Sequence, residues 1–313
     1  MPGSPLIAVG GSAGSIEALH RLLPCFPPNF GAAIAVVIHR SPAQDENRLV
    51  HVLERCASLP VRQARDGEPI LPGHVYVGPS RVHLGVGDGA LHFLVSPKEN
   101  GARPAIDVLF RSAAEGAPDG VAAVLLSGML DDGTAGLAAV KARGGLTVVQ
   151  DPNDARFGDM PRNALASIDV DVVAPIDGIV PVLVDFAAAG GYRPVHKPLT
   201  SELSSFGCPD CGGVLWEREE GGALNFVCRI GHAYSPKALE RRNESAIEEA
   251  LWTAVRALEE RADLSERLAE RLQKQGLTTA AARMSRQAAE ARARSRRVRN
   301  ALPAMNATNE ESN

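Results

Sequence analysis

The segment LIAVGGSAG, residues 6–14, decides the fold that we expect for the N-terminal part of the chain. Its first four residues form a continuous apolar run, and small residues follow directly. An unbroken apolar run is typical of a strand that is buried on both faces, as strands of parallel sheets are. The small residues allow a sharp turn into the helical pattern of residues 15–23.

Three more apolar runs repeat this pattern, at residues 34–39, 121–126 and 147–150, and a helical pattern covers residues 133–143. Alternating strands and helices predict an α/β fold with a doubly wound, mostly parallel sheet. Residues 75–77, 82–84 and 91–95 form shorter runs, separated by Gly-Pro-Ser and Gly-Asp-Gly. We expect these runs to form antiparallel hairpins, inserted in the sheet or at its edge.

The composition limits the classes of function. The chain has 313 residues, of which 45% are hydrophobic, so we expect one large domain and a smaller partner. Aromatic residues make up 4%, which argues against stacking surfaces for single-stranded nucleic acid. No apolar run approaches the roughly 20 residues that a membrane span needs. No basic region precedes the first apolar stretch, so we expect no signal peptide and a cytoplasmic location.

We expect five segments along the chain: an α/β domain over residues 1–190, a linker over 191–206, a Cys/His unit over 207–235, a helical hairpin or coiled coil over 236–304 and a flexible tail over 305–313. Apolar residues recur every three or four positions between Ile247 and Leu272, and Gly276 interrupts the pattern. Residues 281–300 hold seven Arg and one Glu. These helices could form a solvated hairpin, a homodimer surface or a docking surface.

The turn after the first run fits the pattern G-x-S-x-G, with Ser12 at its centre. A strand-to-helix turn of this kind exposes a serine hydroxyl at the carboxyl edge of the sheet, and the next helix N-terminus favours negative charge. The same turn could hold a nucleotide phosphate, or it could be a tight turn and nothing more. The pattern alone leaves these three interpretations open.

Two other strand ends deliver polar residues to the same edge. His39 ends the second run, and Asp131 and Asp132 follow the third, before a helical pattern. The histidine could be a core residue, and the acids could cap the helix. A serine, a histidine and an aspartate at one edge also form a nucleophile, base and orienting group. Their order in the chain differs from that of α/β-hydrolases.

Six blocks carry a resemblance to a known family. They read IAVGGSAGSIEAL, AIAVVIHRSP, ILPGHVYVGPSRVHL, RPAIDVLFRSAAE, VLLSGMLDDGTAGL and QDPNDARFGDMPRNAL. In this order they resemble the catalytic domain of CheB, the chemotaxis receptor glutamate methylesterase. The resemblance implies a mostly parallel sheet, a methylated chemoreceptor cytoplasmic domain as substrate, and release of methanol. Deamidation of receptor glutamines by the same route is a second activity of some family members.

The resemblance also implies roles for single residues. Ser12 is then the nucleophile, His39 the base and Asp132 the orienting carboxylate, because the family aspartate directly precedes the glycine of G-M-x-x-D-G. The backbone N–H groups near Ala13 and Met129 are candidates for the oxyanion hole.

Arg162 is a candidate contact for an acidic substrate. Two departures from the family bear on regulation and specificity. Arg40 stands where the family often has Met, and the chain starts at the first strand, so we expect a separate regulator in place of a receiver domain.

The Cys/His unit has the spacing C-x2-C-x16-C-x3-H, formed by Cys208, Cys211, Cys228 and His232. Three thiolates and one imidazole can surround Zn²⁺ as a tetrahedron with no open position, which predicts a structural site and no catalytic cofactor. So short a unit needs a metal for stability. It resembles the zinc-ribbon-like extension that follows stand-alone CheB-type domains.

Two further hypotheses compete with the esterase. In the first, a CheB-like fold has lost catalysis and serves as a signalling adaptor, which scaffolds a sensory complex through the Cys/His unit and the helices. In the second, the Cys/His unit and the Arg-rich helix bind nucleic acid, although a solvated basic helix explains the same charge.

Overall fold

The computed structural model describes residues 4–40, 46–117, 119–191, 200–220 and 222–307. The chain divides into two compact units, residues 1–239 and 240–313. The first unit is built around a seven-stranded sheet with the order β10-β9-β8-β1-β2-β5-β3, in which all strand pairs are parallel. The strands are β1 (Leu6–Gly11), β2 (Ala33–Ile38), β3 (Val61–Gln63), β5 (Val75–Val77), β8 (Val121–Leu125), β9 (Leu146–Gln150) and β10 (Val172–Ala174).

The strand order explains where a site can form. From β1 the chain builds the sheet outward through β2, and it later returns through β8 on the other side of β1. In open α/β sheets, such a reversal leaves a crevice outside the carboxyl ends of the strands. The predicted α/β fold with a parallel sheet is confirmed.

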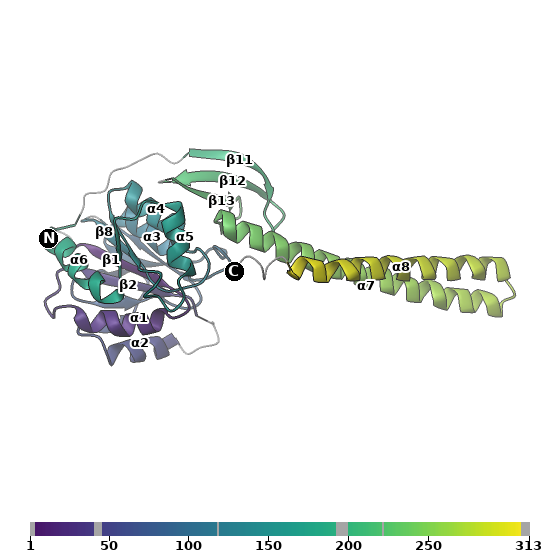
Figure 1. Ribbon diagram of the computed structural model, residues 1–313, viewed down its shortest axis with the longest axis horizontal. Coiled ribbons are helices and arrows are strands. Elements are labelled where there is room, and N and C mark those ends of the chain that lie inside the picture. The colour runs from purple at the N-terminus through teal and green to yellow at the C-terminus, as the bar shows by residue number, and fades with distance from the viewer. Residues whose placement is uncertain (1–3, 41–45, 118, 192–199, 221, 308–313) are drawn as a thin grey trace. The chain divides into compact units, whose positions relative to one another are not determined.

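Helices cover both faces of the sheet (Figure 1). One face carries α1 (Ser15–Leu22), α2 (Glu46–Glu54) and α6 (Ile176–Ala188), and the other carries α3 (Ile106–Gly116), α4 (Thr134–Ala142) and α5 (Asp159–Ser167). A short 3-10 turn, Leu23–Cys25, follows α1. In β1, Ile7 and Val9 pack into the core on the side of α1, α2 and α6, while Leu6 and Ala8 pack into the core on the side of α3, α4 and α5. Both faces are buried, which is why the run contains no polar residue.

The expected hairpins are confirmed in part. Strands β6 (His83–Gly87) and β7 (Ala90–Leu94) pair antiparallel, and β4 (Glu68–Pro69) joins them in a separate three-stranded sheet. The expectation for Val75–Val77 was wrong, because this segment is β5 and pairs parallel with β2 and β3. Tyr76 is fully buried and its hydroxyl accepts hydrogen bonds from Arg62 and the Leu71 N–H, so this strand belongs inside the sheet.

A second, four-stranded antiparallel sheet contains β11 (Thr200–Gly207), β12 (Val214–Glu220), β13 (Ala223–Cys228) and β14 (Ala233–Tyr234). We call residues 200–235 the Cys/His module. Strand β11 begins inside the segment expected as a linker and pairs with β12. The module has a small core of its own, in which Leu215, Phe226 and Tyr234 are buried.

The second unit is a pair of helices, formed by α7 (Pro236–Lys274), of which residues from 240 onward belong to it, and α8 (Thr278–Ala307) (Figure 1). Gly276 turns the chain between them with φ +76°. Ala262 and Ala269 on α7 and Ala288 on α8 are buried. Small residues let two helices approach closely. Thr278–Ala307 continues through residues 305–307 of the expected tail, and residues 308–313 lie outside the described residues.

Three members of the apolar stripe that suggested a coiled coil are exposed on the helix pair. Ile247, Leu264 and Leu268 have exposed fractions of 48%, 60% and 42%. A homodimer through these helices stays a prediction. Among the described residues, no helix combines the length and the apolar character that a membrane crossing needs.

Candidate active site

Two neighbouring strands place Ser12 and His39 at the same level of the sheet. Gly11 and Ile38 are register partners at the carboxyl ends of β1 and β2, and the His39 N–H donates to the Gly11 carbonyl over 3.1 Å. Ser12 and His39 are the next residues on the two strands, and both side chains are partly exposed. Parallel pairing therefore brings together two residues that lie 27 positions apart in the sequence.

The turn after β1 is tightly packed against the loop after β8. Gly14 has φ +76°, and a Cβ atom on it would lie 2.6 Å from the Ser127 hydroxyl. That hydroxyl donates to the Ala13 carbonyl over 2.8 Å, and the Ser12 N–H donates to the Ser127 carbonyl over 3.0 Å. On the other side of the turn, the Ser15 hydroxyl donates to the Ser12 carbonyl over 2.5 Å. These contacts fix the backbone that carries the Ser12 hydroxyl.

His39 pairs with Asp132 and leaves one ring nitrogen for other chemistry. His39 Nε2 lies 2.6 Å from Asp132 Oδ2. Asp131, the neighbouring acid, accepts instead from the Ser235 hydroxyl over 2.5 Å. Within the described residues, no hydrogen bond joins the Ser12 hydroxyl to His39, and in substrate-free enzymes such bonds are often long. The ring nitrogen free to serve Ser12 is Nδ1.

The Asp132 carboxylate is held by the first turn of α3. It accepts from the Ile106 N–H over 2.7 Å and from the Asp107 N–H over 3.2 Å. Burial by itself raises the pKa of Asp132, but the hydrogen bond and charge of His39, together with these donors, outweigh it and lower the pKa. Asp132 is therefore a buried anion, stabilised at a helix N-terminus and aimed at an imidazole.

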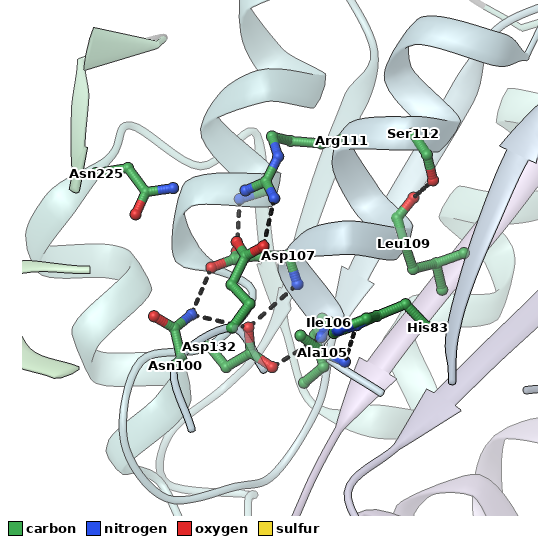
Figure 2. A network of polar contacts seen from close by, with 12 residues as sticks. His83, Asn100, Ala105, Ile106, Asp107, Leu109, Arg111, Ser112, Asp132 and Asn225 are labelled. Atoms are coloured by element: carbon green, nitrogen blue, oxygen red, sulfur yellow. Dashed lines mark hydrogen bonds and ion pairs between the residues drawn. The ribbon is translucent and has the colours of Figure 1, made fainter. Parts of the chain in front are cut away.

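Asn100 and Asp107 complete this network, which Figure 2 shows around Asp132. Asn100 Nδ2 donates to Asp132 Oδ1 over 3.1 Å and to Asp107 Oδ2 over 2.8 Å. Asp107 is fully buried, and its Oδ1 accepts from the Gly136 N–H over 2.6 Å. Burial and then the charge of Asp132 raise the pKa of Asp107 well above its usual value. The two adjacent carboxyl groups therefore differ in pKa, which is lowered at Asp132 and raised at Asp107.

The other predicted site residues lie around the same edge. The Ala13 and Met129 N–H groups belong to the two loops that meet at Ser12, and Met129 is 48% exposed. Within the described part of the chain, neither N–H has a hydrogen-bond partner, as an oxyanion donor requires. Arg162 lies on α5 and pairs with Asp159 over 3.1 Å, with both side chains exposed.

A cavity of about 360 Å³ opens beside His39. Its lining includes three cationic side chains, those of Arg40, Lys98 and Arg103. Arg40 donates to the Gly78 carbonyl over 2.9 Å and Arg103 to the Ser96 carbonyl over 2.9 Å, which hold both guanidinium groups at the rim. A cavity with this charge favours an anionic ligand.

Sequence reasoning missed Asn100 and His83. Asn100 has φ +52°, and the dipeptide Asn100-Gly101 is a turn signal that could have indicated this conformation. His83 is fully buried, and its Nδ1 accepts from the Ala105 N–H over 3.1 Å, just before α3. Burial lowers the pKa of His83, so the imidazole is neutral and supports the loop that leads to Ile106.

A second group of side chains could hold a metal in the Cys/His module. Cys208, Cys211, Cys228 and His232 place their ligand atoms within 4.8 Å of one another. His232 Nδ1 lies 3.6 Å from Cys208 Sγ and 3.5 Å from Cys228 Sγ, and Cys211 Sγ lies 3.7 Å from Cys228 Sγ. Tetrahedral zinc with its usual bond lengths separates two sulfurs by about 3.8 Å and a sulfur from a nitrogen by about 3.6 Å. The donor set and its spacing therefore fit zinc.

Comparison with known proteins gives the family. The family model for CheB methylesterase matches residues 7–183. A relative from Leptospira interrogans is 37% identical over 179 residues, which cover 57% of this chain and 92% of the relative. The protein-glutamate methylesterase/protein-glutamine glutaminase of Bordetella bronchiseptica is 36% identical over 193 residues, and this chain spans 55% of its length.

A solved structure supports the same assignment. The crystal structure of the Thermotoga maritima CheB methylesterase catalytic domain is 34% identical, with a TM-score of 0.55. The match covers all of that chain and 59% of this one. Because the family model covers more than half of the chain and the site lies within the match, this chain belongs to the CheB methylesterase family.

Proposed function

We propose that this CheB-family methylesterase hydrolyses glutamate methyl esters of chemoreceptors, with Ser12 as nucleophile, His39 as general base and Asp132 as orienting carboxylate. The observation that carries the proposal is the 2.6 Å distance between His39 Nε2 and Asp132 Oδ2. The strand register places Ser12 beside His39, because each directly follows one of the paired residues Gly11 and Ile38. The names of the relatives support the substrate class, since they combine glutamate methylesterase and glutamine glutaminase. The substrate segment is the cytoplasmic domain of a methylated receptor.

The reaction is an acyl transfer in two steps. The Ser12 hydroxyl oxygen attacks the ester carbonyl carbon while His39 Nδ1 takes its proton. The N–H groups of Ala13 and Met129 stabilise the oxyanion, each donor contributing on the order of 3 kcal/mol in comparable enzymes. His39 then gives the proton to the departing methoxide, and methanol leaves. Water, deprotonated by His39, attacks the acyl-enzyme and releases the glutamate carboxylate and the Ser12 hydroxyl.

Two details of the site shape this mechanism. Nε2 of His39 is bonded to Asp132, so the proton moves through Nδ1. The anion at Asp132 stabilises the imidazolium that forms after proton transfer.

Glutamine deamidation would follow the same path, with ammonia leaving in place of methanol. The cationic cavity favours receptor segments that carry acidic residues near the methyl ester, and Arg162 on α5 is a second candidate contact for such residues.

We also propose that the Cys/His module binds one structural Zn²⁺ through Cys208, Cys211, Cys228 and His232. Four protein ligands leave no open position, so the ion would supply folding stability and no Lewis acid for the esterase. Tyr234 supports this set from outside, since its hydroxyl donates to Asp210 over 2.6 Å and lies 3.4 Å from Cys208 Sγ. Metal ligands are commonly held by such outer contacts.

The deciding experiment measures methanol release from a methylated chemoreceptor by the native chain and by Ser12→Ala. Release by the native chain and none by the variant supports the esterase and its nucleophile. If neither releases methanol while both bind the receptor, the adaptor hypothesis replaces the proposal. Metal analysis of the same preparation should give one zinc per chain, and a fully folded preparation without metal would contradict the zinc site.

A further inference from the structure

The Cys/His module contacts the loops that hold the catalytic carboxylate. The Asn100 N–H donates to the Ala233 carbonyl over 2.9 Å, and Glu99 forms a parallel bridge with Ala233. All these residues belong to the first compact unit of the chain. The contact joins strand β14 of the module to the segment that precedes α3.

Asn100 links the module directly to Asp132. Its Oδ1 accepts from the Ser235 N–H over 2.8 Å, while its Nδ2 donates to Asp132 Oδ1 over 3.1 Å and to Asp107 Oδ2 over 2.8 Å. The acceptor side of the amide thus faces Ser235 of the module. The donor side faces the carboxyl groups of Asp107 and Asp132 (Figure 2). Only one orientation of the amide satisfies both sides.

Further contacts anchor the loop that carries Asp132. The Ser235 hydroxyl donates to Asp131 Oδ2 over 2.5 Å, next to Asp132 in the chain. Lys237 Nζ donates to Asn163 Oδ1 over 2.9 Å, and Asn163 Nδ2 donates to the Leu130 carbonyl over 2.5 Å. Leu130 has φ +74°, an unfavourable conformation for a leucine, so external contacts help to maintain it.

The candidate metal ligands are continuous with these anchors. His232 directly precedes Ala233, and the Cys228 N–H donates to the His232 carbonyl over 2.9 Å. Binding of an ion at Cys228 and His232 would fix the turn that leads into β14. The path from the ligand cluster to Asp132 therefore consists of Ala233, Ser235 and Asn100.

We infer that Asn100 is a positioning residue for the esterase, through which the folded Cys/His module holds Asp132 in line with His39. This inference rests on the proposed triad and adds a role for the module in the reaction. The module supplies no reacting group. It fixes the carboxylate that orients the base, and displacement of a catalytic group by 1 Å can lower a rate by about 100-fold.

The test starts with two substitutions in the full chain. Asn100→Gly removes the side chain and tolerates φ +52°, and Asn100→Asp keeps the acceptor for Ser235 but loses the donor to Asp132. We expect kcat to fall about 10-fold to 100-fold in both, with KM unchanged. Asp88→Gly is the matched control, since Asp88 has φ +49° in the β6–β7 turn and its kcat should stay native.

The coupling is tested by a double-mutant cycle with Cys228→Ser, which disrupts the ligand cluster. We expect Cys228→Ser to lower kcat in the native background and to cause no further loss in Asn100→Gly. Losses that multiply, or a Cys228→Ser chain with native kcat, would overturn the inference. Circular dichroism of the full chain checks that each variant keeps its helices and strands.

A second readout needs no substrate. In ¹⁵N-histidine NMR spectra, the His39 Nε2 proton shared with Asp132 should give a downfield signal in the native chain. We expect Asn100→Gly and Cys228→Ser each to shift or broaden it, and Asp88→Gly to leave it unchanged. An unmoved signal in both variants overturns the inference. Failure of the proposed function gives a different result, in which the native chain releases no methanol but still shows the His39 signal.

Discussion

His39 Nε2 and Asp132 Oδ2 lie 2.6 Å apart, and this pairing determines which imidazole nitrogen is left for Ser12. The pair joins the ends of β2 and β8, on either side of β1, whose own end carries Ser12. Ser12 and His39 therefore follow β1 and β2 directly, and Asp132 lies in the loop after β8.

Asp132→Asn should lower kcat by about 10³-fold to 10⁴-fold, because an amide at this position stabilises the wrong imidazole tautomer and no imidazolium. Steady-state methanol release gives the value. Asp131→Asn is the matched control, since Asp131 contacts Ser235 and not His39, and its loss should stay under tenfold. A loss under tenfold in Asp132→Asn would contradict the orienting role.

Asp107 should make the stability of the α/β domain depend on pH. Its pKa is raised in the folded state, so folding takes up a proton at any pH between the unfolded value of about 3.9 and the folded value. The stabilising contribution is complete below pH 4 and decreases by about 1.4 kcal/mol per pH unit as the pH rises through this window. Chemical denaturation at a series of pH values above 4 should show this decrease in stability, and Asp107→Asn should remove it. If Asp107→Asn keeps the slope of the native chain, the raised pKa of Asp107 is not its cause.

Gly14→Ala should impair both stability and activity. The residue would take φ +76°, and its Cβ would lie 2.6 Å from the Ser127 hydroxyl. The left-handed conformation alone destabilises a non-glycine residue by about 1–2 kcal/mol. Thermal melting and methanol release measure the two effects. Gly31→Ala is the control, because a Cβ there meets no atom within 4 Å, and it should melt at or slightly above the native temperature.

The cationic cavity should determine affinity for the receptor. We expect the double variant Lys98→Glu and Arg103→Glu to raise KM for the methylated receptor about tenfold at low salt, with kcat little changed. The difference should shrink at 0.5 M salt, because screening weakens exposed charges. Arg55→Glu reverses an exposed charge elsewhere and should leave KM near native. If the double variant and Arg55→Glu have equal KM values, the cavity does not take part in substrate recognition.

Metal loss should unfold the module and spare most of the α/β domain. Cys208→Ser removes a buried ligand and should reduce bound zinc well below one per chain, with an earlier melting transition. Cys25 is an exposed free cysteine, so Cys25→Ser should keep full zinc content and the native melting profile. Zinc content by elemental analysis, with calorimetry, checks both. Full zinc in Cys208→Ser would disprove this ligand set.

Local patterns were sufficient to predict the main strands and the residues at their ends. Runs such as residues 6–9 and 34–38 are apolar throughout because both faces of the sheet are covered, and that signal is strong. Residues 75–77 were misassigned because a three-residue strand carries no pattern that separates parallel from antiparallel pairing. Ser12 and His39 were predicted to lie together because parallel strands share one carboxyl edge, whereas the choice of Asp132 over Asp131 came from the family resemblance.

Asn100 could not be found in this way. Its role depends on Ser235, 135 positions away, and on a module whose docking is not encoded in any local pattern. The Asn-Gly dipeptide indicates a turn but not what the amide faces. Strand β11 was missed for a similar reason, because residues 200–207 acquire their strand pairing from β12.

The register of β1 and β2 has a consequence for partial loss of structure. Ser12 and His39 are attached to the central strands, which local opening reaches last, whereas Asp132 lies in a loop that the Cys/His module secures from outside. Opening of the module alone would leave Ser12 and His39 in place and release Asp132 from its position. The enzyme would then retain a reduced turnover in place of none.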